Sequence, residues 1–256
     1  MTDPTAQAAD TLWAAWTGGY QLAELPDEVR PVDAAAGWAV QRALAELAGP
    51  SYGYKIAATS AAGQAHIGVG GPLPGALFDR FRREPGAVLR SARLHMGVVE
   101  AEFAFRLASD VPAGATEEQV LAAVGALHLA IEVPDSRFEH FERAGEAQLL
   151  ADVACAGWFV LGPAVPGWRE LDLATAPTRL LVNGAEAATG SGAAVLGDPR
   201  TALGWLAGQL ERFGTGLRAG DVVTTGTTTA PPAIGAGDAV RAEFGPLGAV
   251  ELSFAR

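Results

Sequence analysis

The sequence contains almost no lysine. Of its 18 basic residues, 17 are arginine and Lys55 alone is lysine, while 29 acidic residues bring the formal net charge to −11. An acidic surface repels nucleic-acid phosphates and anionic lipids, so neither nucleic acid nor a membrane is expected as a partner. The densest basic run, Arg80 to Arg83, is too short to change that expectation.

Cysteine and long apolar runs are also scarce. Cys155 is the only cysteine, which excludes an intramolecular disulfide and a zinc site built from several cysteines. No stretch approaches the roughly 20 apolar residues that span a bilayer, and the start, Met1 to Pro4, lacks the basic region of a signal peptide. We therefore expect a cytoplasmic protein.

Several familiar site motifs are missing as well. The sequence has no Walker A motif, no dinucleotide-binding glycine motif after a strand and no Gly-x-Ser-x-Gly elbow. The glycine-rich segments 68–71 and 190–192 are therefore expected to be loops. Four histidines, at positions 66, 95, 128 and 140, show no spacing typical of a zinc protease or a histidine-rich iron site.

The first 50 residues have helical character. Asp3-Pro4 predicts a helix start, and a second helix is expected from about Asp33 until Gly49-Pro50 ends it. These two helices form a predicted layer or lid, residues 1–50.

Residues 51–256 differ in character and are predicted to form short strands with a few inserted helices. Helices are expected after the capping box at Thr116 and after Asp198-Pro199. Strands are expected at 52–56, 98–107, 127–133, 156–161, 179–182 and 222–225, followed by a hairpin over 240–254. Strict βαβ alternation is absent, so the prediction is an α+β fold, with one catalytic domain around a mixed β-sheet or roll.

Two glutamates mark the most informative strand. Residues two apart on a strand share a face, so Glu100 and Glu102 should point the same way. If the strand is buried, a hard divalent cation such as Mg²⁺ or Mn²⁺ would relieve their repulsion and desolvation. A strand with its polar face in water is the alternative. Glu132 ends another apolar run, where a ligand could sit, whereas Asp135 is expected to cap the following turn and to pair with Arg137.

Lys55 lies in an aromatic and aliphatic segment, so its ammonium is expected to be partly buried. A buried lysine near a cation has a lowered pKa and can transfer protons. The alternative is a surface lysine whose stem covers apolar neighbours. Since arginine serves at every other basic position, the lone lysine favours a role that needs a titratable amine.

Five segments occur together in a characteristic order: Gly53-Tyr-Lys-Ile-Ala-Ala-Thr-Ser60, Val99-Glu-Ala-Glu-Phe-Ala-Phe105, Ile131-Glu-Val-Pro-Asp-Ser-Arg137, Gly190-Ser-Gly-Ala-Ala-Val-Leu-Gly197 and Ala219-Gly-Asp-Val-Val-Thr-Thr-Gly226. In these segments the chain resembles the hydratase/decarboxylase family typified by 2-keto-4-pentenoate hydratase and 4-oxalocrotonate decarboxylase, within the fumarylacetoacetate hydrolase superfamily. The resemblance covers essentially the whole chain.

The resemblance implies a mixed β-roll preceded by helices, a homo-oligomer and a Mg²⁺ or Mn²⁺ site. The implied residues are the metal ligands Glu100, Glu102 and Glu132, the catalytic Lys55 and Asp79, and the substrate-binding Thr227 and Ser191. The chain departs from the family at Ala57, at His95-Met-Gly97, at Cys155-Ala156 and over residues 70–75.

The implied activity is a hydratase of aromatic catabolism that adds water to a 2-hydroxy-2,4-dienoate and yields a 4-hydroxy-2-oxo acid. Decarboxylation of 4-oxalocrotonate (2-oxohex-3-enedioate) and C–C hydrolysis of an acylpyruvate are the alternatives within the superfamily. A non-catalytic homologue is the rival from another class, and the intact glutamates and Lys55 argue against it.

Overall fold

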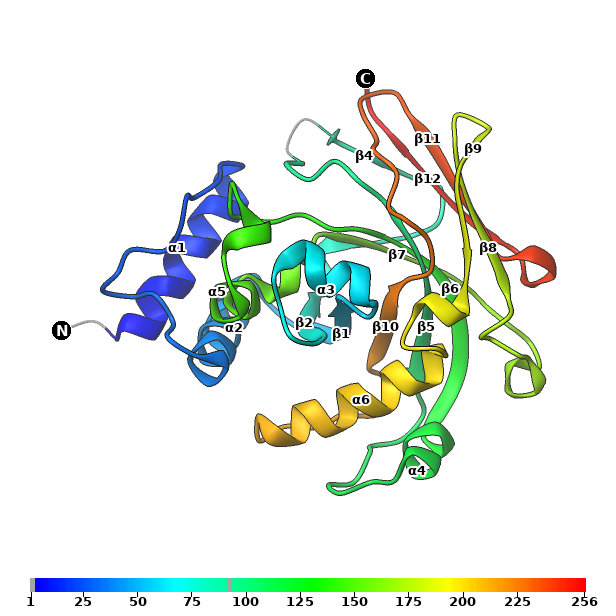
Figure 1. Cartoon of the computed structure of the whole chain (residues 1–256), viewed down its shortest axis with the longest axis horizontal. Coiled ribbons are helices and arrows are strands. Elements are labelled where there is room, and N and C mark those ends of the chain that lie inside the picture. Colours follow the sequence, from blue (N-terminus) through cyan, green and yellow to red (C-terminus); the bar gives the residue numbers. More distant parts are fainter. Residues whose placement is uncertain (1–2, 92–93) are drawn as a thin grey trace.

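A computed structural model describes residues 3–91 and 94–256 of the chain. The N-terminal helices gather at one end of the molecule, and two curled β-sheets occupy the rest, with further helices along their side (Figure 1). Strands and helices do not alternate regularly, and parallel and antiparallel pairs occur in both sheets. The predicted α+β class, with a mixed β-roll, is confirmed.

The four predicted helices begin where the sequence predicts. The side chains of Asp3 and Asp33 accept hydrogen bonds from Thr5 and Ala36, and Asp198 caps its helix in the same way. The helices are α1 (Pro4–Gly18), α2 (Ala34–Ala48), α3 (Ala61–Ile67), α4 (Glu117–Ala122), α5 (Glu146–Ala151) and α6 (Pro199–Arg212). Among the described residues, no helix has the length and hydrophobicity needed to cross a membrane.

The helical layer packs on the edge of the larger sheet. Leu12 of α1 and Leu44 of α2 share an apolar cluster with Phe78 and Phe138. The short helix α3 was not predicted, because its alanine-rich sequence lacks apolar periodicity; the side chain of Ser60 caps it, and none of its residues is fully buried.

The larger sheet has seven strands in the order β2-β1-β10-β5-β6-β7-β3. Its strands are β1 (Ser51–Ala57), β2 (Leu73–Phe78), β3 (Arg82–Arg83), β5 (Glu100–Leu107), β6 (Val124–Val133), β7 (Trp158–Ala164) and β10 (Val222–Thr227). Strand β5 lies between β10 and β6, so its central residues are buried on both faces. The glutamate-bearing strand is therefore interior.

The smaller sheet has five strands in the order β4-β12-β11-β8-β9. Its strands are β4 (Ala87–Leu89), β8 (Pro177–Val182), β9 (Ala185–Ser191), β11 (Ala239–Glu243) and β12 (Ala249–Phe254). The predicted C-terminal hairpin is β11–β12. One expectation was wrong: Gly190 and Ser191 do not lie in a loop but pair with β8 at the end of β9.

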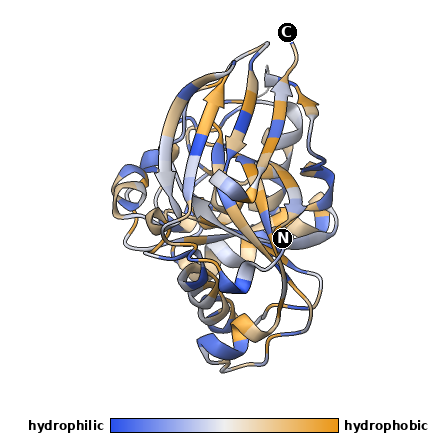
Figure 2. Ribbon diagram, turned by 90° about the vertical axis from the view of Figure 1, so that its right-hand side faces the viewer, coloured by the Kyte–Doolittle hydropathy of each residue, from blue (hydrophilic) through white to orange (hydrophobic). Residues whose placement is uncertain are grey.

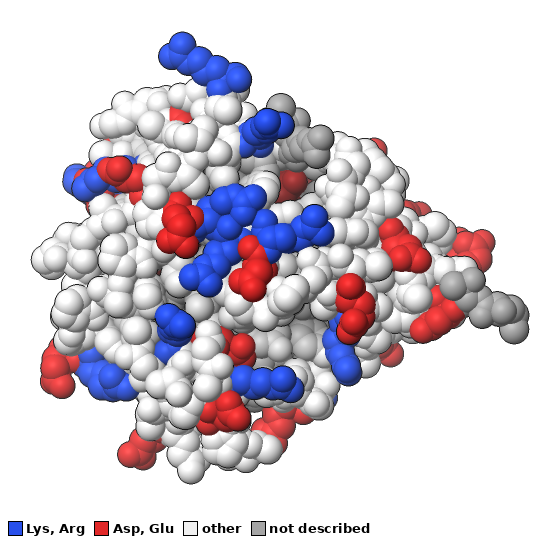
Figure 3. Space-filling model, turned by 180° about the vertical axis from the view of Figure 1, so that it is seen from behind, with Lys and Arg blue, Asp and Glu red and all other residues white. Residues whose placement is uncertain are grey.

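The main core lies between the two sheets. Phe103 of β5 meets Phe244, next to β11, edge to face with ring centres 5.2 Å apart. Hydrophobic residues run along the strands (Figure 2), whereas charged side chains of both signs occupy the surface, with a local basic group on the face seen in Figure 3. The larger sheet thereby packs against the smaller one through this shared core.

Candidate metal and substrate site

Strand register brings the three glutamates together. Glu100 on β5 stands directly opposite Glu132 on the antiparallel β6, and Glu102 lies two residues further along β5 on the same face. One carboxylate oxygen from each lies within 4.8 Å of the others. Glu102 and Glu132 are completely buried, and Glu100 is half-buried at the edge of a cavity. The arrangement can therefore hold an ion at the wall of that cavity.

The glutamate oxygens are only partly satisfied by the protein. Thr224 Oγ1 donates to Glu102 Oε2, which also accepts from the backbone N–H of Gly226 at 2.9 Å. Among the described residues, Glu102 Oε1 and Glu132 Oε2 have no hydrogen-bond partner. Burying an unpartnered carboxylate oxygen is costly, and carboxylate oxygens are the ligands that hard divalent cations prefer. The donor set therefore fits a divalent metal ion.

Lys55 completes the charge balance of the cluster. Its Nζ lies 3.1 Å from Glu132 Oε1 and donates to the backbone oxygen of Ala154 at 3.0 Å. Three ionised carboxylates and one ammonium sum to −2, which a single divalent cation would neutralise. The side chain is buried rather than on the surface, so the alternative of a surface lysine is wrong.

Burial changes the ionisation of all four groups. Burial raises the pKa of Glu100 and of Glu102, and it raises the pKa of Glu132 to about 7 although Lys55 opposes the shift. Burial by itself lowers the pKa of Lys55. The negative charges of Glu132, Glu100 and Glu102 together raise that pKa by more, so it lies above the pKa of an ordinary lysine. This is the reverse of the lowering expected from the sequence, because the nearest charged groups are carboxylates.

A left-handed turn positions the Lys55 ammonium. Val153, Ala154 and Cys155 all have positive φ angles, of 46°, 52° and 59°, which non-glycine residues rarely adopt. The turn aims the Ala154 carbonyl at Lys55. Strand β2 can pass close to it because residue 75 is glycine: a Cβ there would lie 2.0 Å from the Val153 oxygen. Strained backbone therefore lies directly beside Lys55 and the three glutamates.

The cavity has a volume of about 810 Å³, and Lys55 and Glu100 line it. One side, which we call the hydroxyl wall, consists of Thr59, Thr189, Thr227, Thr228 and Thr229. Another side, which we call the apolar wall, consists of Ala57, Ile67, Met96, Phe141, Ala154 and Cys155, which also share one hydrophobic cluster. Burial raises the pKa of Cys155 to about 12, so its thiol stays neutral at pH 7.

Three further residues were predicted to bind substrate or to transfer protons, and they differ in their position relative to the cavity. Thr227 lines the cavity, but its hydroxyl donates to the Thr229 backbone oxygen at 2.9 Å. Ser191 is half-buried at the end of β9 and is not among the lining residues, although its neighbour Gly190 is. Asp79 is exposed at the end of β2, and it too lies outside the cavity lining.

Sequence reasoning missed two features of the site. Thr229 lines the cavity with a buried hydroxyl that has no hydrogen-bond partner among the described residues; its signal was the run of threonines around Gly226. Asp135 does not pair with Arg137, which instead binds Asp152. It accepts hydrogen bonds from the backbone N–H groups of His95 and Met96, and so fixes the segment that leads into β5.

The chain is similar to proteins of one enzyme superfamily. The fumarylacetoacetate (FAA) hydrolase C-terminal family matches residues 55–255. A 2-keto-4-pentenoate hydratase of Burkholderia vietnamiensis is 35% identical over 97% of both chains, and a 4-oxalocrotonate decarboxylase of Pseudomonas putida is 33% identical over 85% of this chain and 82% of that one.

A solved structure extends the likeness to three dimensions. The 4-oxalocrotonate decarboxylase from Pseudomonas putida G7, complexed with magnesium and adipate, superimposes with a TM-score of 0.89 at 28% identity, covering 98% of this chain and 97% of that one. The chain therefore belongs to the fumarylacetoacetate hydrolase superfamily, in the family of the 2-keto-4-pentenoate hydratases and 4-oxalocrotonate decarboxylases.

Proposed function

We propose that this protein is a divalent-metal-dependent hydratase that converts a 2-hydroxy-2,4-dienoate and water into a 4-hydroxy-2-oxo acid. The observation that carries the proposal is the buried cluster of Glu100, Glu102 and Glu132, with Lys55 beside it, in the wall of a cavity. The 35% identical relative named 2-keto-4-pentenoate hydratase supports the same reaction.

The three glutamates are the proposed ligands of Mg²⁺ or Mn²⁺. When bound, the cation would supply Lewis-acid stabilisation of negative charge on the 2-oxygen of the substrate. The protein contributes the orientation of the ligands: the β5–β6 register sets Glu100 against Glu132, and Thr224 with Gly226 holds Glu102. Structures of relatives with calcium, magnesium and manganese support a divalent ion of this kind.

Lys55 is the proposed proton-transfer group. The Lys55 ammonium would donate a proton to C5, and the resulting neutral amine would take up the enol proton, which gives the 2-oxo-3-enoate and restores the ammonium. Water then adds its oxygen to C4 and its proton to C3. The raised pKa of Lys55 keeps a proton on Nζ, where Glu132 and Ala154 fix its direction. Asp79 has no part in this proposal, since it lies outside the cavity lining.

The hydroxyl wall is the proposed binding site for the substrate carboxylate. Thr229 has a free donor there, and Thr227 fixes the Thr229 backbone through its own hydroxyl. A hydrogen bond to a charged acceptor contributes about 1.5–3 kcal/mol. Ser191 could act on this wall only through the position of Gly190, whose backbone packs against the Thr228 oxygen.

We also propose that the protein is a cytoplasmic homo-oligomer, as the family resemblance implies. Light scattering coupled to size-exclusion chromatography at several concentrations tests the assembly, and a single monomer mass throughout would rule it out. Cell fractionation tests the location.

One assay separates the candidate reactions. Purified protein with Mg²⁺ or Mn²⁺ is incubated with 2-hydroxypenta-2,4-dienoate and, separately, with 4-oxalocrotonate, while absorbance loss and CO₂ are recorded. The hydratase consumes the dienoate without CO₂, and release of CO₂ from oxalocrotonate as the faster reaction would select the decarboxylase instead. Lys55→Met should lower kcat by about 100-fold or more. Wild-type turnover by that variant would refute the role of Lys55.

A further inference from the structure

Arg137 holds both ends of the strained turn beside Lys55. Its Nη2 donates to the Asp152 backbone oxygen at 2.6 Å, and its Nη1 donates to the Ala156 backbone oxygen at 2.8 Å. These two carbonyls come immediately before and immediately after residues 153–155, the left-handed turn that holds the Lys55 ammonium. One guanidinium therefore spans the turn, whose middle carbonyl fixes the proposed proton-transfer group.

The guanidinium is itself fixed by an ion pair inside the protein. Arg137 Nε donates to Asp152 Oδ1, and Ser136 Oγ donates to Asp152 Oδ2 at 2.8 Å. All three side chains are buried, and only 2% of the Arg137 surface is exposed. A buried charge is tolerated where it is paired and fully hydrogen-bonded, and here all three guanidinium nitrogens donate to the segment 152–156.

Helix α1 contacts the guanidinium through Trp16. The Arg137 Cζ lies 4.0 Å from the centre of the Trp16 ring, a distance at which the ring face attracts a cation. The same indole stacks on Phe81, with ring centres 4.3 Å apart and planes 4° from parallel. The N-terminal helical layer therefore reaches the support of Lys55 through one aromatic side chain.

The turn needs this support because its backbone conformation is unfavourable by itself. Positive φ angles at three consecutive non-glycine residues persist only where the surrounding structure holds them. Besides the two bonds from Arg137, the backbone N–H of Asp135 donates to the Cys155 oxygen at 2.9 Å. Segment 135–137 thus binds three carbonyls around the turn, and it begins three residues after the proposed metal ligand Glu132.

We propose that Arg137 is a positioning residue for Lys55, and that Asp152 and Trp16 hold its guanidinium in place. The planar fork of arginine binds two carbonyls at once, which the single flexible ammonium of a lysine cannot do. Loss of the fork lets the Ala154 carbonyl move and misdirects the Lys55 ammonium. The inference rests on the proposed function for what that ammonium does, and names a further residue on which its direction depends.

The single lysine of the chain provides a direct test. Protein labelled with [ε-¹³C]lysine gives one lysine side-chain signal in a nuclear magnetic resonance spectrum, that of Lys55. The double variant Arg137→Gln/Asp152→Asn loses the fork but leaves no buried charge unpaired. We expect its Lys55 signal to shift and broaden. A signal that coincides with that of the wild type would overturn the inference, whatever reaction the protein catalyses.

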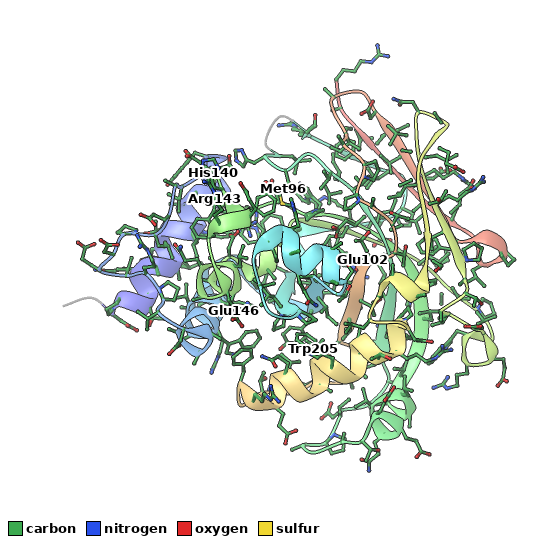
Figure 4. All side chains as sticks on the ribbon, viewed as in Figure 1. Met96, Glu102, His140, Arg143, Glu146 and Trp205 are labelled. Atoms are coloured by element: carbon green, nitrogen blue, oxygen red, sulfur yellow. The ribbon has the colours of Figure 1, made fainter. Side chains whose placement is uncertain are left out.

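Arg143→Gln is the matched control for the double variant. Arg143 is exposed, and Figure 4 shows it well apart from Glu102. The Lys55 signal of this variant should coincide with that of the wild type. A shift as large as in the double variant would mean that the signal responds to any lost arginine, and would overturn the assignment to Arg137.

Arg137→Lys tests the same assignment by kinetics. It keeps a positive charge beside Asp152, so it should fold even if the double variant does not. With 2-hydroxypenta-2,4-dienoate and Mn²⁺, we expect kcat to fall about 10- to 100-fold, while KM and Mn²⁺ affinity stay within about twofold of wild type. A wild-type kcat, or an equal loss of Mn²⁺ affinity, would overturn the inference. If the wild type hydrates no dienoate, the proposed function fails and the Lys55 signal alone decides.

Trp16→Leu tests the contribution of α1. The variant leaves the Arg137–Asp152 pair and the single lysine in place, and we expect the Lys55 signal to shift less than in the double variant. Trp13→Leu is its control, because Trp13 lies on the same helix and packs on Trp16 and Arg80. An unchanged signal in Trp16→Leu, or equal shifts in both variants, would overturn the part assigned to Trp16.

Discussion

Lys55 Nζ lies 3.1 Å from Glu132 Oε1, although the two residues belong to strands separated by two others in the sheet. Both side chains are buried, with 4% and 0% of their surfaces exposed. Their contact joins Lys55 to the cluster that Glu132 forms with Glu100 and Glu102. It also makes the ionisation of Lys55 and of the three glutamates interdependent.

Glu102→Gln should weaken metal binding without unfolding the protein. The amide keeps the size of the side chain and an acceptor for Thr224 and Gly226, but removes one negative charge from the cluster. We expect Mn²⁺ affinity, measured from free Mn²⁺ by electron paramagnetic resonance, to fall at least about tenfold. Glu84→Gln, at an exposed position, is the control. Equal affinity in Glu102→Gln and wild type would exclude Glu102 as a ligand.

The stability of the metal-free protein and the stabilisation added by metal should depend on pH in opposite ways. Burial raises the pKa of Glu132 to about 7, so the folded protein keeps a proton there that the unfolded chain releases near the ordinary glutamate pKa of 4.5. The free energy of unfolding of the metal-free protein should therefore fall as pH rises from about 4.5 to 7. Metal affinity should rise over the same interval, because the ion displaces that proton.

Thermal unfolding in EDTA and in excess Mg²⁺, from pH 5 to 8, measures both effects. The stabilisation by Mg²⁺ should grow with pH. A metal-free melting temperature that increases between pH 5 and 7 would contradict the assignment of a protonated, buried Glu132, provided that secondary structure stays constant across the series.

Thr229→Val and Thr227→Val should separate substrate binding from structure. The Thr229 hydroxyl has no partner among the described residues, so its removal should leave stability nearly unchanged while raising KM for the dienoate about tenfold. Thr227→Val removes the hydrogen bond to the Thr229 oxygen and should cost about 1 kcal/mol of stability. Steady-state kinetics and urea unfolding of both variants test the distinction, and an unchanged KM in Thr229→Val would refute it.

Gly75→Ala should disturb Lys55 from a distance. The new Cβ would lie 2.0 Å from the Val153 oxygen and 3.1 Å from the Lys55 Cγ, so the turn that carries the Ala154 carbonyl must move. We expect a loss of about 1–3 kcal/mol in stability, together with a lower kcat and a shifted pH profile.

Gly71→Ala is the matched control for this variant, because a Cβ at Gly71 meets no neighbour within 4 Å. A fall in stability without any change in the pH profile of kcat would mean that Gly75 serves packing alone and does not position the ammonium.

Local pattern accounts for what could be predicted. The alternation in β5 places Glu100 and Glu102 on one face, and Asp3-Pro4, Asp33 and Asp198-Pro199 mark helix starts, because these signals depend on neighbours within a few residues. Helix α3 was not predicted because local signals were insufficient. Its cap, Ser60, is local, but the contact of His66 with Phe141 joins residues that are distant in sequence.

The sequence by itself determined the residue types of the site, with three carboxylates and a single lysine in segments that form strands. Tertiary structure alone decided which of them meet. The strand order β1-β10-β5-β6 and the Glu100–Glu132 register bring Lys55 and the glutamates together, while the end of β2 leaves Asp79 outside the cavity lining. The physical reason is that strand pairing joins residues far apart in the chain, and the burial that sets their pKa values exists only once the sheet has closed around them.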